Sequence, residues 1–389
     1  MDVENLRRQI PTTQQMTYLN TGWEGPSPTS VVEAIRARLD YENQVGPTSS
    51  DALESGKEVR TQAKEAIATL VNAAPREILL TENTTEGINI VLNGLPWQED
   101  DEVITCDLEH PSILLPTYHL QDRHGVKVNV LPFAPNAEHS AIVSAVEEAL
   151  SDRTRMVFLS HIEYSCGLRM PIEEIARLTR PRGIWLMVDG AQGPGHVSLD
   201  LRELGCDFYA MPGQKWLLGP DGTGALFIRE PMVSAVQPDR VGSYSVKEFD
   251  LSGSYEPETE NIDKFLVSTT STPLRVGFLQ AVRFISDIGI GEVTGRSAAL
   301  ASSFRAELSK VEGVEVVSPM DGPGCTSLVS FAIASADHEA VVALLWKNDG
   351  ILARRVRYPD SIRASLAFFN TETEVAQLVE SVRGLAKGR

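Results

Sequence analysis

The chain has 389 residues, enough for two domains or for one large and one small domain, and its composition is ordinary for a globular protein. Its 53 acidic and 35 basic side chains give a formal net charge of -18, and no Lys/Arg cluster stands out, which argues against nucleic acid or an anionic membrane surface as a partner. No run of 18 apolar residues and no signal-like N-terminal segment occurs, so we expect a cytoplasmic protein that does not enter the membrane.

The first two thirds of the chain alternate strand-like apolar runs with helix-like periodic segments, which predicts an α/β sheet with helical crossovers. The predicted strands include 102–106, 126–133, 155–160 and 183–188. The predicted helices are 30–42, 56–71, 86–92, 140–151 and 172–178.

The sequence changes character after residue 242. A polar, glycine-rich stretch over 243–262 predicts an excursion of the chain across the surface. Helical patterns over 274–311, an apolar strand at 326–333 and helices at 339–347 and 372–385 then predict a smaller α+β domain.

One lysine carries the strongest chemical signal. Lys215 lies in a glycine-bounded turn, MPGQKWLLGPDGTG, and Asp189 follows the apolar run IWLMV, which is typical of a buried parallel strand. Asp189 should therefore emerge at the carboxyl end of a strand, where open α/β sheets bind ligands. A lysine that forms an imine and a carboxylate that keeps a pyridine nitrogen protonated are the two groups that pyridoxal 5'-phosphate (PLP) requires.

Two further segments support a PLP site. In ENTTEGINIVLNGL, Asn83, Thr84 or Thr85 can cap a helix, and a helix start binds phosphate through free N–H groups. An ordinary helix cap remains open as the other interpretation. His110 follows the strand at 102–106 and can stack on a pyridine ring or move protons, although a structural role is equally compatible with its position.

The cysteines are scattered. They show neither the paired spacing of a zinc site nor the density of a disulfide scaffold, so we expect buried thiols and no metal; they are Cys106, Cys166, Cys206 and Cys325.

The order of the motifs TENTTEGIN, DLEHPS, LSHIEYSCG, VDGAQ, GQKW and SIRASLAFFN resembles the class V aminotransferase and cysteine desulfurase branch of the fold-type I PLP enzymes, over nearly the whole chain. The resemblance implies a mostly parallel sheet in a large PLP-binding domain, residues 16–265. It implies a smaller α+β domain from residues 266–389, joined by the N-terminal segment 1–15. It also implies a homodimer whose active sites are shared between subunits.

The resemblance also implies roles for the cofactor-binding residues. Lys215 would form the imine, Asp189 would pair with the pyridine nitrogen, and His110 would stack on the ring. The remaining contacts would come from Gln192 to the ring oxygen, from Thr84, Thr85 and Gln214 to the phosphate, and from Thr269 to the phosphate of the neighbouring subunit.

Substrate contacts follow in the same way. Arg363 stands where the family grips the α-carboxylate, for which a planar guanidinium is suited. Arg354 lies nine positions earlier, the interval at which two arginines hold the carboxylate in the cystine carbon-sulfur lyases. Tyr164 and the segment YLNTGWEG, with Thr21, also resemble that subgroup and are expected to line the side-chain pocket.

Departures from the family pattern argue against a desulfurase. The segment 354–365 has no cysteine where desulfurases carry a mobile loop with a nucleophilic thiol, and Cys325 precedes an apolar strand, which predicts a core position. Gln214 replaces a histidine common in desulfurases.

The expected activity is therefore β-elimination from cystine or another S-substituted cysteine, with Lys215 as the base, giving pyruvate, ammonia and a thiol or persulfide. Isopenicillin N epimerase-like racemisation or transamination is the alternative, because the bond that breaks depends on substrate pose. A cysteine desulfurase comes third. A nucleotide-binding protein or a silent scaffold is disfavoured, since no GxxxxGK[ST] occurs and both Lys215 and Asp189 are present.

Overall fold

The computed structural model describes residues 1–387 and is built around a seven-stranded sheet in the order β2-β8-β7-β6-β5-β3-β4. Strands β3 to β7 run parallel to one another, whereas β8 is antiparallel to both of its neighbours, β2 and β7. The strands are β2 (Ile78–Thr81), β3 (Glu102–Cys106), β4 (Lys127–Leu131), β5 (Thr154–Ser160), β6 (Trp185–Asp189), β7 (Phe208–Pro212) and β8 (Gly224–Ile228). The predicted mostly parallel α/β sheet is confirmed.

Helices cover both faces of this sheet, because successive strand residues point to opposite sides. Val103 packs in one core with α4 (Thr84–Gly94) and α5 (Pro111–His124). The next residue, Ile104, packs in the other core with α3, α6, α7 and α9. The helices on this second side are α3 (Ser50–Leu70), α6 (His139–Ala149), α7 (Ile172–Thr179), α8 (Leu201–Leu204) and α9 (Thr272–Ile288), and α2 (Thr29–Val45) packs beside α9.

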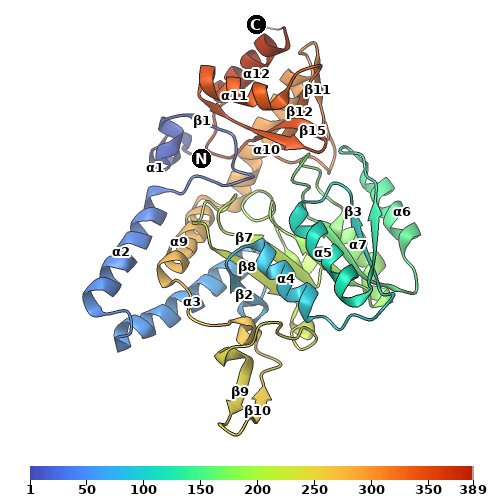
Figure 1. Ribbon diagram of the computed structural model, residues 1–389. Helices are drawn as coiled ribbons and strands as arrows, with labels where there is room; N and C mark the ends of the chain where they lie inside the picture. Colours follow the sequence, from blue (N-terminus) through green and yellow to red (C-terminus); the bar gives the residue numbers. More distant parts are fainter. Residues whose placement is uncertain (388–389) are drawn as a thin grey trace.

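A second, antiparallel sheet in the order β11-β12-β15-β14 forms the upper end of the molecule in Figure 1. Its strands are β11 (Val314–Val316), β12 (Leu328–Ile333), β14 (Arg354–Arg357) and β15 (Asp360–Ser365). Its core is shared with α10 (Ile290–Leu308), α11 (His338–Asp349) and α12 (Glu372–Ala386). The predicted smaller α+β unit thus exists; its exact boundaries, residues 1–15 and 266–389, stay a prediction.

The N-terminal segment lies at the same end (Figure 1). After α1 (Val3–Gln9), strand β1 (Thr17–Tyr18) pairs in parallel with β13 (Ile351–Leu352). Short 3₁₀ turns occur at Pro11–Gln14, Pro75–Glu77, Arg180–Arg182, Glu230–Met232, Ser243–Ser245 and Ile262–Phe265. The pairing of β1 with β13 brings the segment after Tyr18 close to the β14–β15 hairpin.

Three sequence-based expectations need correction. Helix α3 starts at Ser50, capped by the Ser49 side chain, six residues before the predicted start. Helix α5 was not predicted, because Pro116 and the exposed Leu115 interrupt its apolar pattern. Cys325 lies before β12 and is only partly buried, so its assignment to the core is wrong, whereas the other three cysteines are buried as expected.

The polar stretch over 243–262 is exposed as predicted, and most of it forms a hairpin of β9 (Val246–Phe249) and β10 (Tyr255–Pro257). It projects from the lower end of the molecule in Figure 1. Within residues 1–387, none of the helices combines the length and the apolar character needed to span a bilayer.

Candidate active site

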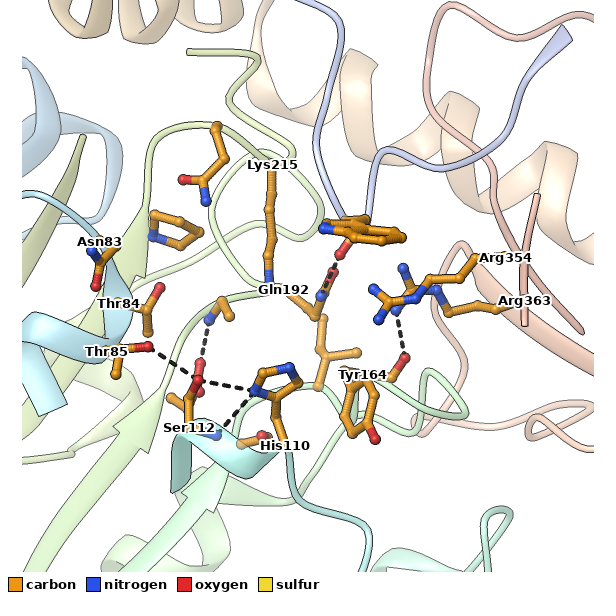
Figure 2. Close-up of a pocket in the computed structure, with 18 residues that line it drawn as sticks. Asn83, Thr84, Thr85, His110, Ser112, Tyr164, Gln192, Lys215, Arg354 and Arg363 are labelled. Atoms are coloured by element: carbon orange, nitrogen blue, oxygen red, sulfur yellow. Dashed lines mark hydrogen bonds between the residues drawn. The ribbon is translucent and has the colours of Figure 1, made fainter. Parts of the chain in front are cut away.

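A cavity of about 250 Å³ lies where the carboxyl ends of β5 and β6, the starts of α4 and α5, the β7–β8 loop and the β14–β15 hairpin meet. Parallel strands end at one edge of the sheet, which is where such sheets bind ligands. All but two of the twelve predicted site residues line it: Thr84, Thr85, His110, Tyr164, Asp189, Gln192, Gln214, Lys215, Arg354 and Arg363. Figure 2 shows the threonines on one side of the cavity, the arginines on the other and Lys215 between them.

Lys215 lies in the loop between β7 and β8, as its glycine-bounded turn predicts. Backbone hydrogen bonds from Gly213 N to Thr223 O and from Gly219 N to Gly213 O close this loop. Gly25 packs so closely that an added Cβ would lie 2.2 Å from the Lys215 carbonyl oxygen. Burial lowers the pKa of Lys215 to about 8. The charge of Asp189 opposes this shift, and the charges of Arg363 and Arg354 add to it. The neutral amine of Lys215 is thus more accessible near neutral pH than that of an ordinary lysine.

Asp189 is the last residue of β6 and is buried. Its Oδ1 accepts a hydrogen bond from Ala191 N at 2.7 Å. Burial raises the pKa of this carboxyl, and the nearby Lys215 opposes the shift. A buried carboxylate of this kind needs a cationic partner, and a protonated pyridine nitrogen would supply one.

The start of α4 forms the opposite end of the cavity. Asn83 caps the helix by accepting from Glu86 N, while Thr84 and Thr85 occupy its first turn. The Thr85 hydroxyl donates to Ser112 Oγ at 3.0 Å. Free N–H groups, the helix dipole and hydroxyls in one place form a suitable site for a phosphate.

His110 and Tyr164 form an aromatic pair at the bottom of the cavity in Figure 2. Their rings pack edge to face, with centroids 4.8 Å apart. The His110 Nδ1 accepts from Ser112 N and caps α5, so the ring is held in one orientation. Burial first, and then the charges of Lys215, Arg354 and Arg363, lower the pKa of His110 to about 4. His110 is therefore a neutral imidazole at pH 7.

Arg354 and Arg363 are cross-strand neighbours, because β14 and β15 pair with Arg354 directly opposite Arg363. The nine-residue interval thus places both guanidinium groups in the cavity. Arg363 is fully buried, and its Nη1 donates to Tyr164 O at 2.8 Å, while Nε and Nη2 have no partner within residues 1–387. Burial lowers the pKa of Arg363 to about 9, and the charge of Arg354 adds to this shift. Unpaired guanidinium donors match a substrate carboxylate.

Gln192 is held by partners that sequence reasoning missed. Its Oε1 accepts from the Trp216 indole N–H at 2.7 Å, and its Nε2 donates to Gly22 O at 2.8 Å. One amide hydrogen therefore remains for a ligand in the cavity. Gln214 also faces the cavity, and its buried Oε1 has no hydrogen-bond partner in the described part of the chain.

The two remaining predicted residues do not line the cavity. Thr21 is buried, and its neighbours Gly22 and Trp23 line the cavity instead. Thr269 lies in a separate hollow of about 400 Å³ with Arg240. Their roles, toward the substrate and toward the phosphate of a neighbouring subunit respectively, stay predictions.

A buried acidic group behind the cavity was also missed, since its members are adjacent only in the fold. Glu109 accepts from Ser160 N at 2.7 Å and from Ser160 Oγ at 2.5 Å, and Ser160 is the register partner of Asp189. Glu163 and Cys106 lie against it. Burial raises the pKa of Glu109 to about 8, opposed by the hydrogen bonds from Ser160 and reinforced by the charge of Asp189. Glu109 thus ties the turn before His110 to the strand beside Asp189.

We expect Glu109→Gln to change how stability depends on pH. Folding raises the pKa of Glu109, so protonation of this carboxyl stabilises the folded state. The stabilisation is complete below about pH 4.5 and is lost as the pH rises through about 8. Between pH 5 and 8, the unfolding free energy of the wild type should therefore fall relative to that of the variant, by at most about 1.4 kcal/mol per pH unit. Thermal unfolding across this range measures the difference. Glu58→Gln, at an exposed helical position, is the control, and parallel profiles for wild type and Glu109→Gln would contradict the expectation.

The cavity as a whole fits PLP. A helix N-terminus with two threonines, a buried carboxylate that needs a cation and a lysine with a lowered pKa all line it. The unpartnered nitrogens of Arg363 remain for an amino-acid carboxylate. This donor set accounts for each polar end of a PLP-bound amino acid.

Comparisons with known proteins agree with this geometry. The family model described as aminotransferase class-V matches residues 18–378. A probable cysteine desulfurase of Methanothermobacter thermautotrophicus is 29% identical over 403 residues, covering 99% of this chain and 98% of the relative. Isopenicillin N epimerase of Amycolatopsis lactamdurans is 30% identical, covering 98% of each. The solved complex of the cystine C-S lyase C-DES with cysteine persulfide superposes with a TM-score of 0.89 at 30% identity, covering 96% of this chain and 99% of that one.

Proposed function

Because the chain belongs to the aminotransferase class-V family and is a PLP-dependent enzyme, we propose that it is a carbon-sulfur lyase acting on cystine or another S-substituted cysteine. The observation that carries the proposal is the make-up of the cavity. A lysine with a lowered pKa faces it, together with two arginines that have no acidic partner within residues 1–387, and among the same residues no cysteine lines it. This arrangement suits removal of an α-proton and lacks the thiol that attacks substrate sulfur in desulfurases.

The residues that would hold PLP follow from the geometry. Thr84, Thr85 and the N–H groups of α4 would bind the phosphate, Asp189 would pair with the pyridine nitrogen, and Lys215 would bind the aldehyde. Bound PLP supplies an electron-withdrawing ring that accepts the electron pair released at the substrate α-carbon. His110 is neutral and held in place by Ser112, as a ring that packs against the cofactor face should be.

The protein residues then have defined tasks. Arg363 and Arg354 bind the α-carboxylate and so orient the α-hydrogen, and Lys215 Nζ removes that hydrogen as a proton. The β-carbon to sulfur bond breaks, and its electron pair leaves on sulfur. With cystine and one water, the products are pyruvate, ammonia and cysteine persulfide. A sulfur leaving group is needed, because the expelled anion must be stable.

Epimerisation of an amino acid is the second candidate, favoured by the 30% identity to isopenicillin N epimerase over nearly all of both chains. The same residues bind and deprotonate the substrate in that reaction, and the proton returns to the α-carbon from the opposite face. The outcome depends on which bond lies perpendicular to the ring, which is a matter of pose.

The products formed from L-cystine by the PLP-loaded enzyme test the proposal. Pyruvate and ammonia in equal amounts support the lyase. Alanine with released sulfur would instead identify a desulfurase, and D-amino acid without pyruvate would identify an epimerase. No turnover of cystine or of any S-substituted cysteine would refute the lyase assignment.

We further propose that the enzyme works as a homodimer and that the β9–β10 hairpin takes part in the interface. Phe249, Leu251 and Tyr255 are strongly exposed on this projecting hairpin, where apolar side chains are costly in water. Leu251→Asp combined with Phe249→Asp should therefore weaken association at least about tenfold. Sedimentation equilibrium over a dilution series measures it. Leu344→Asp, at an exposed apolar position on α11, is the control, and an unchanged dimer constant in the hairpin variant would contradict its part in the interface.

A further inference from the structure

The two arginines of the cavity are held in different ways. Arg363 is anchored through Nη1 to Tyr164 O and is fully buried in the small sheet. The Arg354 guanidinium makes no hydrogen bond or ion pair within residues 1–387. Its guanidinium lies over the Trp23 indole instead, with Cζ 3.9 Å from the ring centroid. The indole is thus the described contact that orients Arg354.

This contact opposes an electrostatic repulsion. Arg354 and Arg363 face each other across β14 and β15, and each charge disfavours the other. Arg354 is only partly buried and lacks a hydrogen bond like the one that anchors Arg363, so this repulsion favours its displacement toward solvent unless an attraction opposes it. The face of an indole attracts a guanidinium through its negative quadrupole, and the attraction grows where water is excluded. Trp23 lines the cavity and is about half exposed, at 53%. It therefore lies between the cavity and the solvent.

Trp23 is positioned by the same loop that carries the lysine. The preceding carbonyl, Gly22 O, accepts from Gln192, which is held by the indole of Trp216, the residue after Lys215. Gly25 N donates to Gln214 O at 2.6 Å, and Gly25 has no room for a side chain. The turn around Trp23 is therefore fastened to the lysine loop on both sides.

We propose that Trp23 is a specificity-determining residue that holds Arg354 in the cavity beside Arg363, so that the two guanidinium groups together select and orient the α-carboxylate of the substrate. This inference rests on the proposed function in one respect, namely that the cavity binds an amino acid. Trp23 is a positioning residue, because it acts on the carboxylate through Arg354. Loss of the indole should weaken carboxylate binding more than it slows the chemical step.

The test compares Trp23→Ala with Trp23→Phe in the PLP-loaded enzyme. Glycine, which carries the carboxylate but has no β-substituent to lose, is titrated, and its dissociation constant is read from the absorbance of the cofactor. Trp23→Ala should raise that constant about tenfold, the size of a partly desolvated cation–π contact, and Trp23→Phe should restore much of the affinity. With a reactive substrate, KM should rise while kcat stays within about twofold.

A double-mutant cycle separates this role from a general loosening of the site. Arg354→Ala should raise the dissociation constant for glycine by a similar factor, and Trp23→Ala added to Arg354→Ala should add little. Trp346→Ala, which removes a half-exposed tryptophan from α11 outside the cavity, should leave glycine binding unchanged. An unchanged constant in Trp23→Ala, or full additivity with Arg354→Ala, would overturn the proposal.

The glycine titration does not depend on which amino acid the enzyme converts. If the wild type binds glycine but leaves cystine intact, the lyase assignment fails while the role of Trp23 is still measured. If glycine does not bind to the wild type at all, both the proposed carboxylate site and the proposed role of Trp23 are refuted.

Discussion

The Lys215→Ala variant should no longer bind the cofactor covalently, and its activity should fall by at least about 10³-fold. The variant removes both the amine that binds the PLP aldehyde and the proposed base, and loss of a general base alone costs about 10² to 10⁴-fold. The absorbance band of the lysine-bound cofactor should disappear, and pyruvate formation from cystine should fall with it. Added PLP should still bind, without a covalent link, because Thr84, Thr85 and Asp189 remain.

A second lysine makes this prediction specific. Burial also lowers the pKa of Lys264 to about 8, but its Nζ donates to Val233 O and Thr259 O, and it lies outside the cavity. Borohydride reduction of the loaded enzyme, followed by peptide mapping, should therefore place the cofactor on Lys215 and not on Lys264. Exposed Lys57→Ala is the activity control. A cofactor trapped on Lys264, or a Lys215→Ala enzyme that keeps full activity, would contradict the assignment.

Arg363→Ala should raise KM for the amino-acid substrate at least about 100-fold. Its two unpartnered nitrogens face the cavity, and charge-assisted hydrogen bonds to a carboxylate are worth roughly 1.5–3 kcal/mol each. Because Arg363 is fully buried and donates to Tyr164 O, part of the loss should come from movement of Tyr164. Steady-state kinetics and glycine titration both measure the effect.

Two companion variants sharpen the result. Arg363→Lys keeps the charge but not the planar fork, so it should recover only part of the affinity. Arg357→Ala, at the exposed end of β14, should behave as the wild type, because Arg357 does not line the cavity. Equal KM values for Arg363→Ala and the wild type would show that the carboxylate binds elsewhere.

Most of the residues that line the candidate site could be predicted from the sequence because their signals are short-range. Asp189 ends an uninterrupted apolar run, and such a run in an α/β pattern becomes a parallel strand whose carboxyl end faces the ligand. Lys215 lies between glycines that permit a tight loop, and Asn83 precedes a helix that it can cap. Even the Arg354 and Arg363 pair is local, since a hairpin converts the nine-residue interval into cross-strand neighbours.

Other parts of the site were beyond sequence reasoning. Glu109 follows β3 and Ser160 ends β5, and the two residues meet only because these strands are neighbours in the sheet. Helix α5, which His110 caps, was hidden by Pro116 in its interior. Thr21, expected in the pocket, is buried beside it while Gly22 and Trp23 line it, because the turn after β1 directs successive side chains to different sides.

The residue types, the strand ends and the helix caps of this enzyme are local properties, and for that reason the sequence alone specifies its α/β sheet and the core of its PLP chemistry. The surroundings of that core come from tertiary structure. Trp23 and Arg354 stand near opposite ends of the chain, and they meet because β1 pairs with β13 and carries the following turn across the lysine loop. Such contacts depend on which strands distant in the sequence pair and on how the elements pack, which no local pattern of residues encodes.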